Sequence, residues 1–231
     1  MQLEQTLKGT TEDQSEKVLE RAPLSVQDWG LIDYSSALQR QLDLVDLVSH
    51  ELARDTLVFC SHPPVVTLGR GTKPGDVYGW QGDIVEVTRG GRATYHGPSQ
   101  VVVYPILDLN TRGRDLHKYM RNLETAIVAT LTEFGIPASG RTRQLTDSGD
   151  EAEATGVWIG SRKLASIGIG VRKWISFHGL ALNVSHDPKA FVGMKPCGFS
   201  TETMVSMEEI LGRPVDQAHV TEVLKGHLLE L

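Results

Sequence analysis

The segment Lys195-Pro196-Cys197-Gly198-Phe199 places one of the two cysteines of the chain between a proline and a glycine. Proline and glycine favour sharp turns, whereas a cysteine that only fills space normally lies within a strand or a helix. A turn would keep the thiol accessible, and a nearby base would increase its thiolate fraction. We therefore predict a nucleophilic role for Cys197, against the alternative of an inert turn cysteine. Cys60 ends the apolar run TLVFC and is expected in the core.

A second candidate group is Lys163, at the start of the segment KLASIGIGV. Alternation along a strand would place it on one face with the apolar residues Ala165, Ile167, Ile169 and Val171. Removing an ammonium group from water favours its neutral form, which can accept a proton. The alternative is that the lysine stem packs while its amine reaches solvent.

The segment RGGRATYHGPSQ, residues 89–100, combines glycines with polar side chains between strands. Glycines allow backbone amides to approach a ligand, and Tyr95, His96 and Gln100 can form hydrogen bonds to it. The alternative is an ordinary hairpin with a polar turn at Gly90-Gly91.

His178, in the segment SFHGLALNV, could position a substrate carbonyl or lie half-buried with satisfied hydrogen bonds. Asn183 follows it five residues later, so on a strand the two would point to opposite faces. This spacing argues against a Cys-His-Asn hydrolase set with Cys197.

Composition narrows the function class. The chain has 231 residues and is 40% hydrophobic, which fits one large domain or two small ones, and we favour one. It contains no run of eighteen apolar residues, and its polar first 22 residues lack the apolar centre of a signal peptide, so a cytoplasmic protein is expected. Two cysteines and no metal-ligand spacing predict neither a disulfide framework nor a metal site. The segments LGRGTKPG and HGPSQ match neither a phosphate loop nor a serine-hydrolase elbow.

The net charge of −6 is unevenly distributed. Basic residues exceed acidic ones over residues 70–121 and 162–195, the two blocks that flank the candidate motifs. This pattern is compatible with a basic rim for an acidic partner, or with an ordinary mixed surface. The rim candidates are Arg70, Lys73, Arg92, Arg162, Arg172 and Lys173.

The expected elements are two amphipathic helices and several strands. One helix is predicted from Tyr34 to Leu52, and a second is predicted to be capped by Asp115 and closed by Gly135. The predicted strands are TLVFC, IVEVT, RATYH, VVVYPIL, GVWIG, KLASIGIGV and HGLALNV, with hairpin turns at Gly90-Gly91 and Gly160-Ser161. Strands in runs around one helix predict an α+β fold with a mixed or mostly antiparallel sheet.

The predicted domain organisation is simple. Residues 1–22 are expected to be a flexible polar extension, and residues 23–231 a single catalytic domain. Within it, the polar segment 143–155 is expected to be a mobile surface loop.

Four motifs occur in a characteristic order: SHPPVVTLGR (61–70), RGGRATYHGPSQ (89–100), GVWIGSRKLASIGIGVRKWISFHGLALNV (156–184) and KPCGF (195–199). Together with WGLIDYSSALQRQ (29–41), they resemble the lipoyl(octanoyl) transferases, and the similarity runs from about residue 29 to about 204. The resemblance implies a single α+β domain similar to biotin and lipoate protein ligases. It also implies a catalytic pair at Cys197 and Lys163.

The resemblance further implies the reaction and the partners. An octanoyl or lipoyl group would pass from acyl carrier protein, through a cysteine thioester, to a lysine of lipoyl domains, as the first step of protein lipoylation. Acceptors would be the E2 subunits of 2-oxoacid dehydrogenases and the glycine cleavage H protein. No cofactor, nucleic acid or membrane partner is implied, and a monomer is expected. The implied substrate-binding residues are Arg89, Gly90, Gly91, Thr94, Tyr95, His96, Gly97, Gln100, Ser166, Ile167, Gly168, His178, Gly179 and Ala181.

One departure and three alternatives accompany the resemblance. The family usually reads H-G-P-G-Q, but this chain has Ser99 at the fourth position, and a side chain there penalises a positive φ. Backbone amides at Cys197-Gly198 are a candidate oxyanion site. An ATP-dependent lipoate or biotin ligase, an amidotransferase between two protein lysines, and a non-catalytic acyl-binding module remain alternatives.

Overall fold

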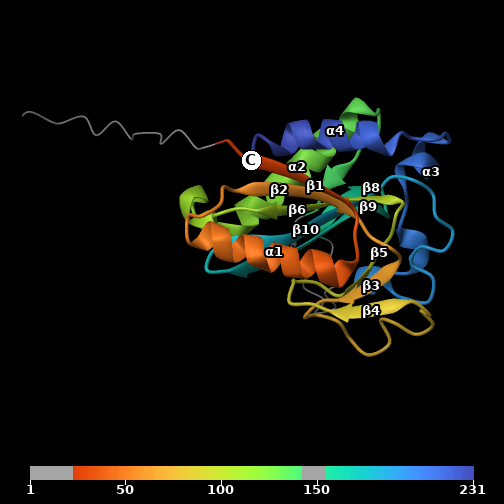
Figure 1. Cartoon of the computed structure of the whole chain (residues 1–231). Coiled ribbons are helices and arrows are strands. Elements are labelled where there is room, and N and C mark those ends of the chain that lie inside the picture. Colours follow the sequence, from red (N-terminus) through yellow and green to blue (C-terminus); the bar gives the residue numbers. More distant parts are fainter. Residues whose placement is uncertain (1–22, 142–154) are drawn as a thin grey trace, which may run out of the picture.

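A seven-stranded mixed sheet forms the centre of the structure, a computed structural model that describes residues 23–141 and 155–231 (Figure 1). Its strands lie in the order β1-β2-β6-β10-β9-β8-β7. β1 runs parallel to β2, and each other neighbouring pair is antiparallel. The strand bounds are β1 Ser25–Leu31, β2 Thr56–Ser61, β6 Gln100–Ile106, β7 Ser139–Gly140, β8 Gly156–Ile159, β9 Arg162–Arg172 and β10 Ile175–Asn183. The predicted α+β fold with a mixed sheet is confirmed.

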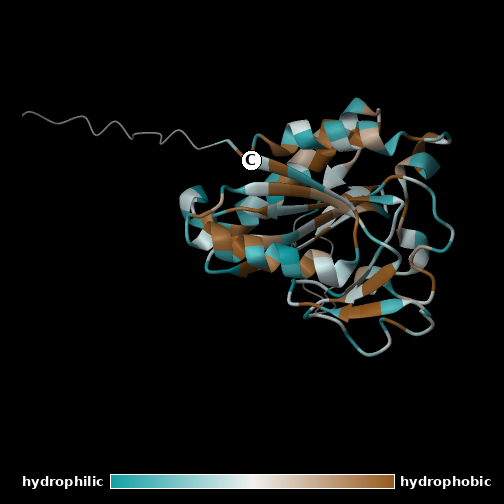
Figure 2. Cartoon of the chain, in the orientation of Figure 1, coloured by the Kyte–Doolittle hydropathy of each residue, from teal (hydrophilic) through white to brown (hydrophobic). Residues whose placement is uncertain are grey.

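Helices cover both faces of this sheet. α1, Tyr34–Ser49, packs on one face, and α2, Leu116–Glu133, and α4, Gln217–Leu228, pack on the other (Figure 1). Alternate side chains of β2 contribute to the hydrophobic cores on the two faces of the sheet. Leu57 and Phe59 pack in the core with α2 and α4, whereas Val58 and Cys60 pack in the core with α1. The hydrophobic residues accordingly concentrate along the strands and the inner faces of the helices (Figure 2). Cys60 lies in the core, as predicted.

A second, three-stranded sheet has the order β4-β3-β5. β3, Val65–Leu68, lies between β4, Asp83–Glu86, and β5, Ala93–His96. The predicted hairpin turn at Gly90-Gly91 is therefore wrong, because β3 separates the two strands that it would join. The loop instead joins the two sheets, since the amide of Gly90 donates to the carbonyl of Ile169 on β9 at 2.9 Å. The predicted turn at Gly160-Ser161 is confirmed by the pairing of Ile159 with Arg162.

Side-chain caps mark the helix starts. Asp115 accepts a hydrogen bond from the amide of Lys118, as predicted for α2, and Asp33 caps α1 in the same way. α1 ends at Ser49 rather than near Leu52, which is 75% exposed, because Glu51 adopts a positive φ that ends the helix.

The remaining elements are short. They are the 3-10 turns η1 Leu109–Arg112, η2 Pro196–Gly198 and η3 Thr201–Thr203, and the short helix α3 Met207–Leu211. The strands β1, β3 and β7 and the helices α3 and α4 were not expected from the sequence. Among the described residues, no helix has the length and apolar character that a membrane crossing requires. The expected extension at 1–22 and most of the expected loop at 143–155 lie outside the described residues.

Candidate active site

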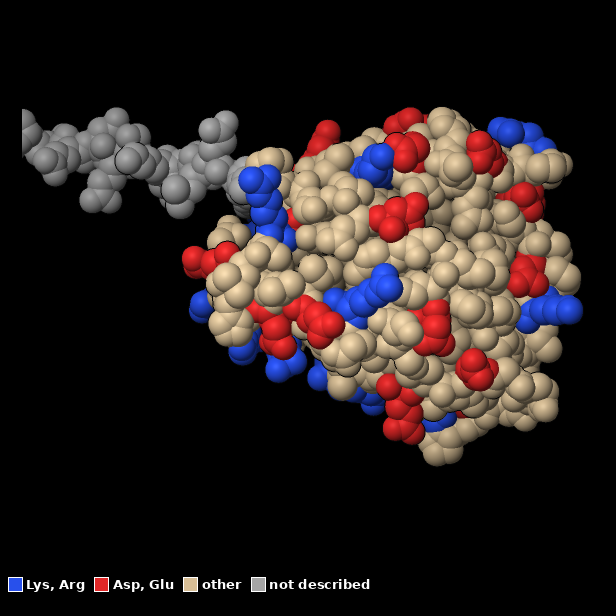
Figure 3. Space-filling view, viewed as in Figure 1, with Lys and Arg blue, Asp and Glu red and all other residues tan. Residues whose placement is uncertain are grey.

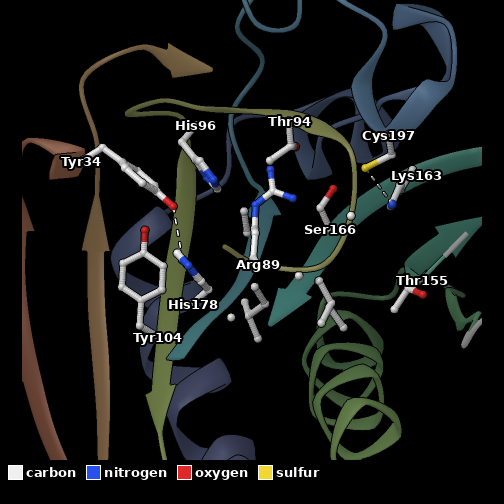
Figure 4. Close-up of a pocket in the computed structure, with 16 residues that line it drawn as sticks. Tyr34, Arg89, Thr94, His96, Tyr104, Thr155, Lys163, Ser166, His178 and Cys197 are labelled. Atoms are coloured by element: carbon white, nitrogen blue, oxygen red, sulfur yellow. Dashed lines mark hydrogen bonds between the residues drawn. The ribbon is translucent and has the colours of Figure 1, made fainter. Parts of the chain in front are cut away.

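Lys163 and Cys197 meet inside the protein although they are 34 residues apart in sequence. Nζ of Lys163 lies 3.4 Å from Sγ of Cys197, and Lys163 is 1% exposed (Figure 4). Nζ of Lys163 also lies 5.5 Å from the centroid of the Trp158 ring. A buried amine in contact with a thiol can exchange a proton with it directly.

A β-bulge in β9 determines where Lys163 points. Trp158 on β8 pairs with Lys163, but its neighbour Val157 pairs with Ala165, so Leu164 is an extra residue on the β9 side. The bulge reverses the alternation, and Lys163 lines the same pocket as Ser166. The prediction that Lys163 shares a face with Ala165 is wrong, because Ala165 lies in the core between the sheet and the helices α2 and α4.

Cys197 lies in the turn η2 with a φ of 52°, in the left-handed region that a non-glycine residue rarely adopts. Such a conformation costs about 1–3 kcal/mol and persists only where the surroundings enforce it. The expectation of an accessible thiol is wrong, since Cys197 is 7% exposed. The turn faces inward because Pro196 is buried and Phe199 packs edge-on against Trp158, with ring centroids 5.2 Å apart.

An ion pair that the sequence did not suggest supports this turn. The guanidinium of Arg92 binds the carboxylate of Asp76, and its Nε lies 3.0 Å from Oδ2. The carbonyl of Asp76 in turn accepts from the amide of Lys195 at 2.7 Å. Burial raises the pKa of Asp76, but the bonds from Arg92 and from the amide of Lys73 outweigh it and hold the pKa below its ordinary value. Asp76 thus connects Arg92 to the start of the cysteine turn.

Many of the residues implied by the family resemblance line one pocket with Lys163 and Cys197. These are Arg89, Gly91, Thr94, His96, Ser166, Ile167, Gly168, His178, Gly179 and Ala181. Tyr34, Tyr104, Thr155 and Leu180 also line it and were not expected. Its free volume is about 30 Å³, room for one or two waters, so a longer ligand must displace side chains as it enters.

Four implied binding residues lie outside this pocket. Gly90 bonds to β9, and Tyr95 packs against Phe191 with ring centroids 5.2 Å apart. Gly97 leaves space for the Tyr95 ring, because a Cβ at this position would overlap it. Gln100 donates to Oδ1 of Asn183 at 2.8 Å, and both residues line a second cavity of 370 Å³. His178 and Asn183 therefore serve different cavities, as their spacing predicts.

Backbone hydrogen bonds near Cys197 and the backbone conformation of Ser99 test two further predictions. The amide of Gly198 already donates to the carbonyl of Lys195 at 3.0 Å, so it is not available as an oxyanion donor. Ser99 does not adopt a positive φ, so the serine introduces no backbone strain. Its carbonyl accepts from the amides of Val184 and Ser185, at 3.1 Å each.

Aromatic and basic side chains line the part of the pocket away from Cys197. The hydroxyl of Tyr34 lies 3.4 Å from Nδ1 of His178. Burial, and secondarily the charge of Arg89, lowers the pKa of His178 to about 3, and burial holds the pKa of His96 well below its usual range. Burial raises the pKa of Tyr34 to about 12. Both imidazoles and the phenol are therefore neutral at physiological pH.

Arg89 is a buried cation beside these rings. It donates to the carbonyls of Gly90 and Thr67, at 2.9 and 3.0 Å, and to Oγ1 of Thr67 at 2.8 Å. The guanidinium group of Arg89 therefore holds the loop 89–91 against β3. Within residues 23–141 and 155–231, no group of His, Cys, Asp and Glu side chains could hold a metal ion.

Comparisons with known proteins agree on one family. Residues 33–229 match the family model of the lipoyl protein ligase A/B catalytic domain. An octanoyltransferase of Bdellovibrio bacteriovorus is 51% identical, over 91% of this chain and 99% of that protein. An octanoyltransferase of Geobacter metallireducens is 39% identical, over 88% and 91%.

Solved structures share the fold at low sequence identity. A lipoate-protein ligase A bound with ATP is 17% identical with a TM-score of 0.69, over 90% of this chain and 85% of that chain. A biotin protein ligase from Aquifex aeolicus is 13% identical with a TM-score of 0.51, over 91% and 68%.

Proposed function

The chain belongs to the octanoyltransferases of the lipoyl protein ligase A/B catalytic domain family, and on that premise we propose that it transfers octanoyl groups through a thioester on Cys197. Octanoyl transfer in protein lipoylation follows from the family itself. The observation that supports the covalent route is the 3.4 Å contact between Nζ of Lys163 and Sγ of Cys197, both facing the same pocket.

In the first half-reaction the donor is octanoyl-acyl carrier protein. Lys163, in its neutral form, takes the proton of Cys197, and Sγ attacks the carbonyl carbon of the donor thioester. The bond between Sγ and the acyl carbon forms, and the bond to the phosphopantetheine sulfur breaks. Lys163 returns the proton to the departing thiolate. One thioester replaces another, so this step is nearly balanced in free energy.

In the second half-reaction the acceptor is a lysine of a lipoyl domain. Its amine attacks the acyl carbon, the bond to Sγ breaks, and the proton that the amine loses passes through Lys163 to the Cys197 thiolate. Amide formation from a thioester runs downhill, so neither half-reaction needs ATP. The proposed acceptors are lipoyl domains of E2 subunits and the glycine cleavage H protein.

The surface charge bears on how these partners dock. Basic and acidic side chains are interspersed over the face seen in Figure 3, which carries no large patch of one sign. Arg70, Lys73, Arg162 and Lys173 are exposed and available for an acidic partner. Arg92 is not, because it is bound to Asp76. Arg172 is exposed as well, in a surface ion pair 3.8 Å from Asp46. We propose Arg70, Lys73, Arg162, Arg172 and Lys173 as the basic rim.

Two further assignments complete the proposal. The mechanism requires Cys197 as a thiol, and the described cysteines are unpaired, so we assign the enzyme to a reducing compartment, the cytoplasm. We further propose that residues 23–231 form a single catalytic domain that acts as a monomer.

Intact mass spectrometry tests the covalent route. Wild-type protein mixed with octanoyl-acyl carrier protein should gain one octanoyl mass, labile to hydroxylamine. Cys197→Ala should gain none, and the matched control Cys60→Ala should gain the same mass as wild type. Octanoylation of a lipoyl domain without any adduct on the enzyme would instead support direct transfer or an ATP-dependent ligase. Binding without turnover would support an acyl-binding module.

A further inference from the structure

The pocket has two chemically different ends. Cys197 and Lys163 lie at one end, and four side chains, which we call the polar end, lie at the other (Figure 4). The polar end consists of Tyr34, His96, Tyr104 and His178. The rest of the lining includes apolar or small residues of two neighbouring strands, which we call the apolar strip: Ile167 and Gly168 of β9 and Gly179, Leu180 and Ala181 of β10. Arg89 and Ser166 lie between the two ends (Figure 4).

Three buried polar atoms of this region have no hydrogen-bond partner among the described residues. They are Nε2 of His178, Nδ1 of His96 and Nε of the neighbouring Arg89. The pocket has room for one or two waters that can pair with these atoms, and a hydrocarbon tail that displaces such a water leaves the atoms unpaired. That loss costs more free energy than one additional buried methylene gains. An apolar tail that reached this end would therefore bind less well than a tail that stops before it.

Hydrogen bonds fix three of the four rings of the polar end, those of Tyr34, Tyr104 and His178. Nδ1 of His178 lies 3.4 Å from the Tyr34 hydroxyl, and the backbone amide of His178 donates to Oε1 of Gln41 at 2.8 Å. Tyr104 is held by His62, whose Nε2 lies 2.7 Å from the phenol oxygen. The other nitrogen of His62 is 2.7 Å from the carbonyl of Ile32. Tyr34, Tyr104 and His178 therefore cannot turn away from an entering chain without breaking these bonds.

We propose that the polar end limits the length of the transferred acyl chain by its polarity, with His178 as the specificity-determining residue. The inference rests on the proposed function, because it assumes that the chain extends from Cys197 along β9 and β10. Chains whose last carbons remain on the apolar strip are favoured. Longer apolar chains are disfavoured because they cover Nε2 of His178 and Nε of Arg89 without pairing either atom. A hydrogen-bond acceptor near the tail removes that penalty.

A competition experiment tests the role of His178. Wild type and variants receive an equimolar mixture of hexanoyl-, octanoyl-, decanoyl- and dodecanoyl-acyl carrier protein, and intact mass reports the early adducts. His178→Leu should raise the share of the longer chains relative to octanoyl by about tenfold. His178→Gln, which keeps polar atoms, should retain the wild-type profile, as should the matched exposed control His117→Leu. An unchanged profile in His178→Leu, or an equal shift in His178→Gln, would overturn the proposal.

A second measurement needs no variant, which matters because His178 has a φ of 55° that leucine tolerates poorly. Decanoyl and dodecanoyl donors are each compared with a donor of the same length in which an ether oxygen replaces the methylene next to the terminal methyl. Wild type should acylate several-fold faster with the ethers. Equal or slower acylation would contradict a limit set by polarity. Absence of every adduct would instead overturn the proposed function.

Discussion

Gly198 lies directly against the guanidinium of Arg92, the side chain that is ion-paired with the buried carboxylate of Asp76. A Cβ at position 198 would overlap this guanidinium, and Gly198 also has a φ of 85°. The turn that carries Cys197 thus packs against a charged group, which leaves no space for a side chain at position 198. Residues that never touch the substrate are therefore expected to control the position of Cys197.

Gly198→Ala should slow formation of the acyl-enzyme by at least about tenfold, because the new methyl group displaces Arg92 or the turn. Rapid mixing and quenching, followed by intact mass spectrometry of the octanoyl adduct, measures this rate. Gly212→Ala is the matched control, because it introduces alanine at a φ of 65° with no atom within 4 Å of the new Cβ. Both variants should lose about 1–2 kcal/mol of unfolding free energy from the left-handed backbone. Equal rates in the two variants would contradict a specific role for the Arg92 contact.

Asp76→Asn should destabilise the protein by about 3 kcal/mol, because it leaves Arg92 without its anionic partner in a buried position. Chemical denaturation measures the change in unfolding free energy. Asp46→Asn is the matched control: Asp46 pairs with Arg172 at 3.8 Å on the surface, and its loss should cost less than about 1 kcal/mol. Similar losses in both variants would show that the Asp76 pair adds nothing beyond a surface ion pair.

Lys163→Met should lower the rate of octanoyl transfer by about 10²–10⁴-fold, because methionine fills similar space but cannot accept a proton. Steady-state transfer to a lipoyl domain measures the rate. Lys195→Met is the matched control, since it removes an exposed ammonium two residues from Cys197. Retention of wild-type activity in Lys163→Met would remove Lys163 from the mechanism.

Stability should fall as the pH drops below about 6.5, because His62, His96 and His178 remain neutral in the folded protein and become protonated when it unfolds. Burial is the main cause of the lowered pKa of each. The unfolded chain therefore binds more protons, and each histidine contributes about 1.4 kcal/mol per pH unit between its folded and unfolded pKa. For His178 this window extends from about 6.5 down to about 3.

Urea denaturation between pH 8 and pH 5 measures this dependence. His178→Gln should reduce the slope below pH 6.5 by the contribution of one proton and leave the slope near pH 8 unchanged. An identical slope in wild type and His178→Gln would mean that His178 is protonated in the folded protein.

Charge reversal at Arg162 and Lys173 should raise the KM for octanoyl-acyl carrier protein at low salt, because both side chains are exposed members of the proposed basic rim. The kcat should change little, and the difference should shrink as salt screens the charges. Reversal at Arg54 and Arg213, two exposed arginines outside the rim, is the matched control. An equal rise in KM for both double variants would indicate that only net charge matters.

Several elements and the two candidate catalytic residues could be predicted from residues that lie close together in the sequence. Asp115 preceding an amphipathic run defines the start of α2, and the glycine at position 160 allows the tight turn between β8 and β9. The combination of a cysteine between proline and glycine with a lysine heading an apolar strand identified Cys197 and Lys163 as candidates. These features depend on residues close in sequence, so the pattern of side chains is enough to predict them.

The tertiary structure alone decided how these residues are combined. Lys163 reaches Cys197 only because an extra residue in β9 reverses the alternation, and a bulge depends on pairing with β8 that no local pattern reveals. Asp76 holds the cysteine turn, and Tyr34 and Tyr104 complete the pocket, although each comes from a separate segment. The inward orientation of Cys197 likewise depends on Trp158, 39 positions earlier in the chain. Contacts between distant segments form only when the sheets and helices pack, so residue types and spacing could propose the catalytic pair but not its surroundings.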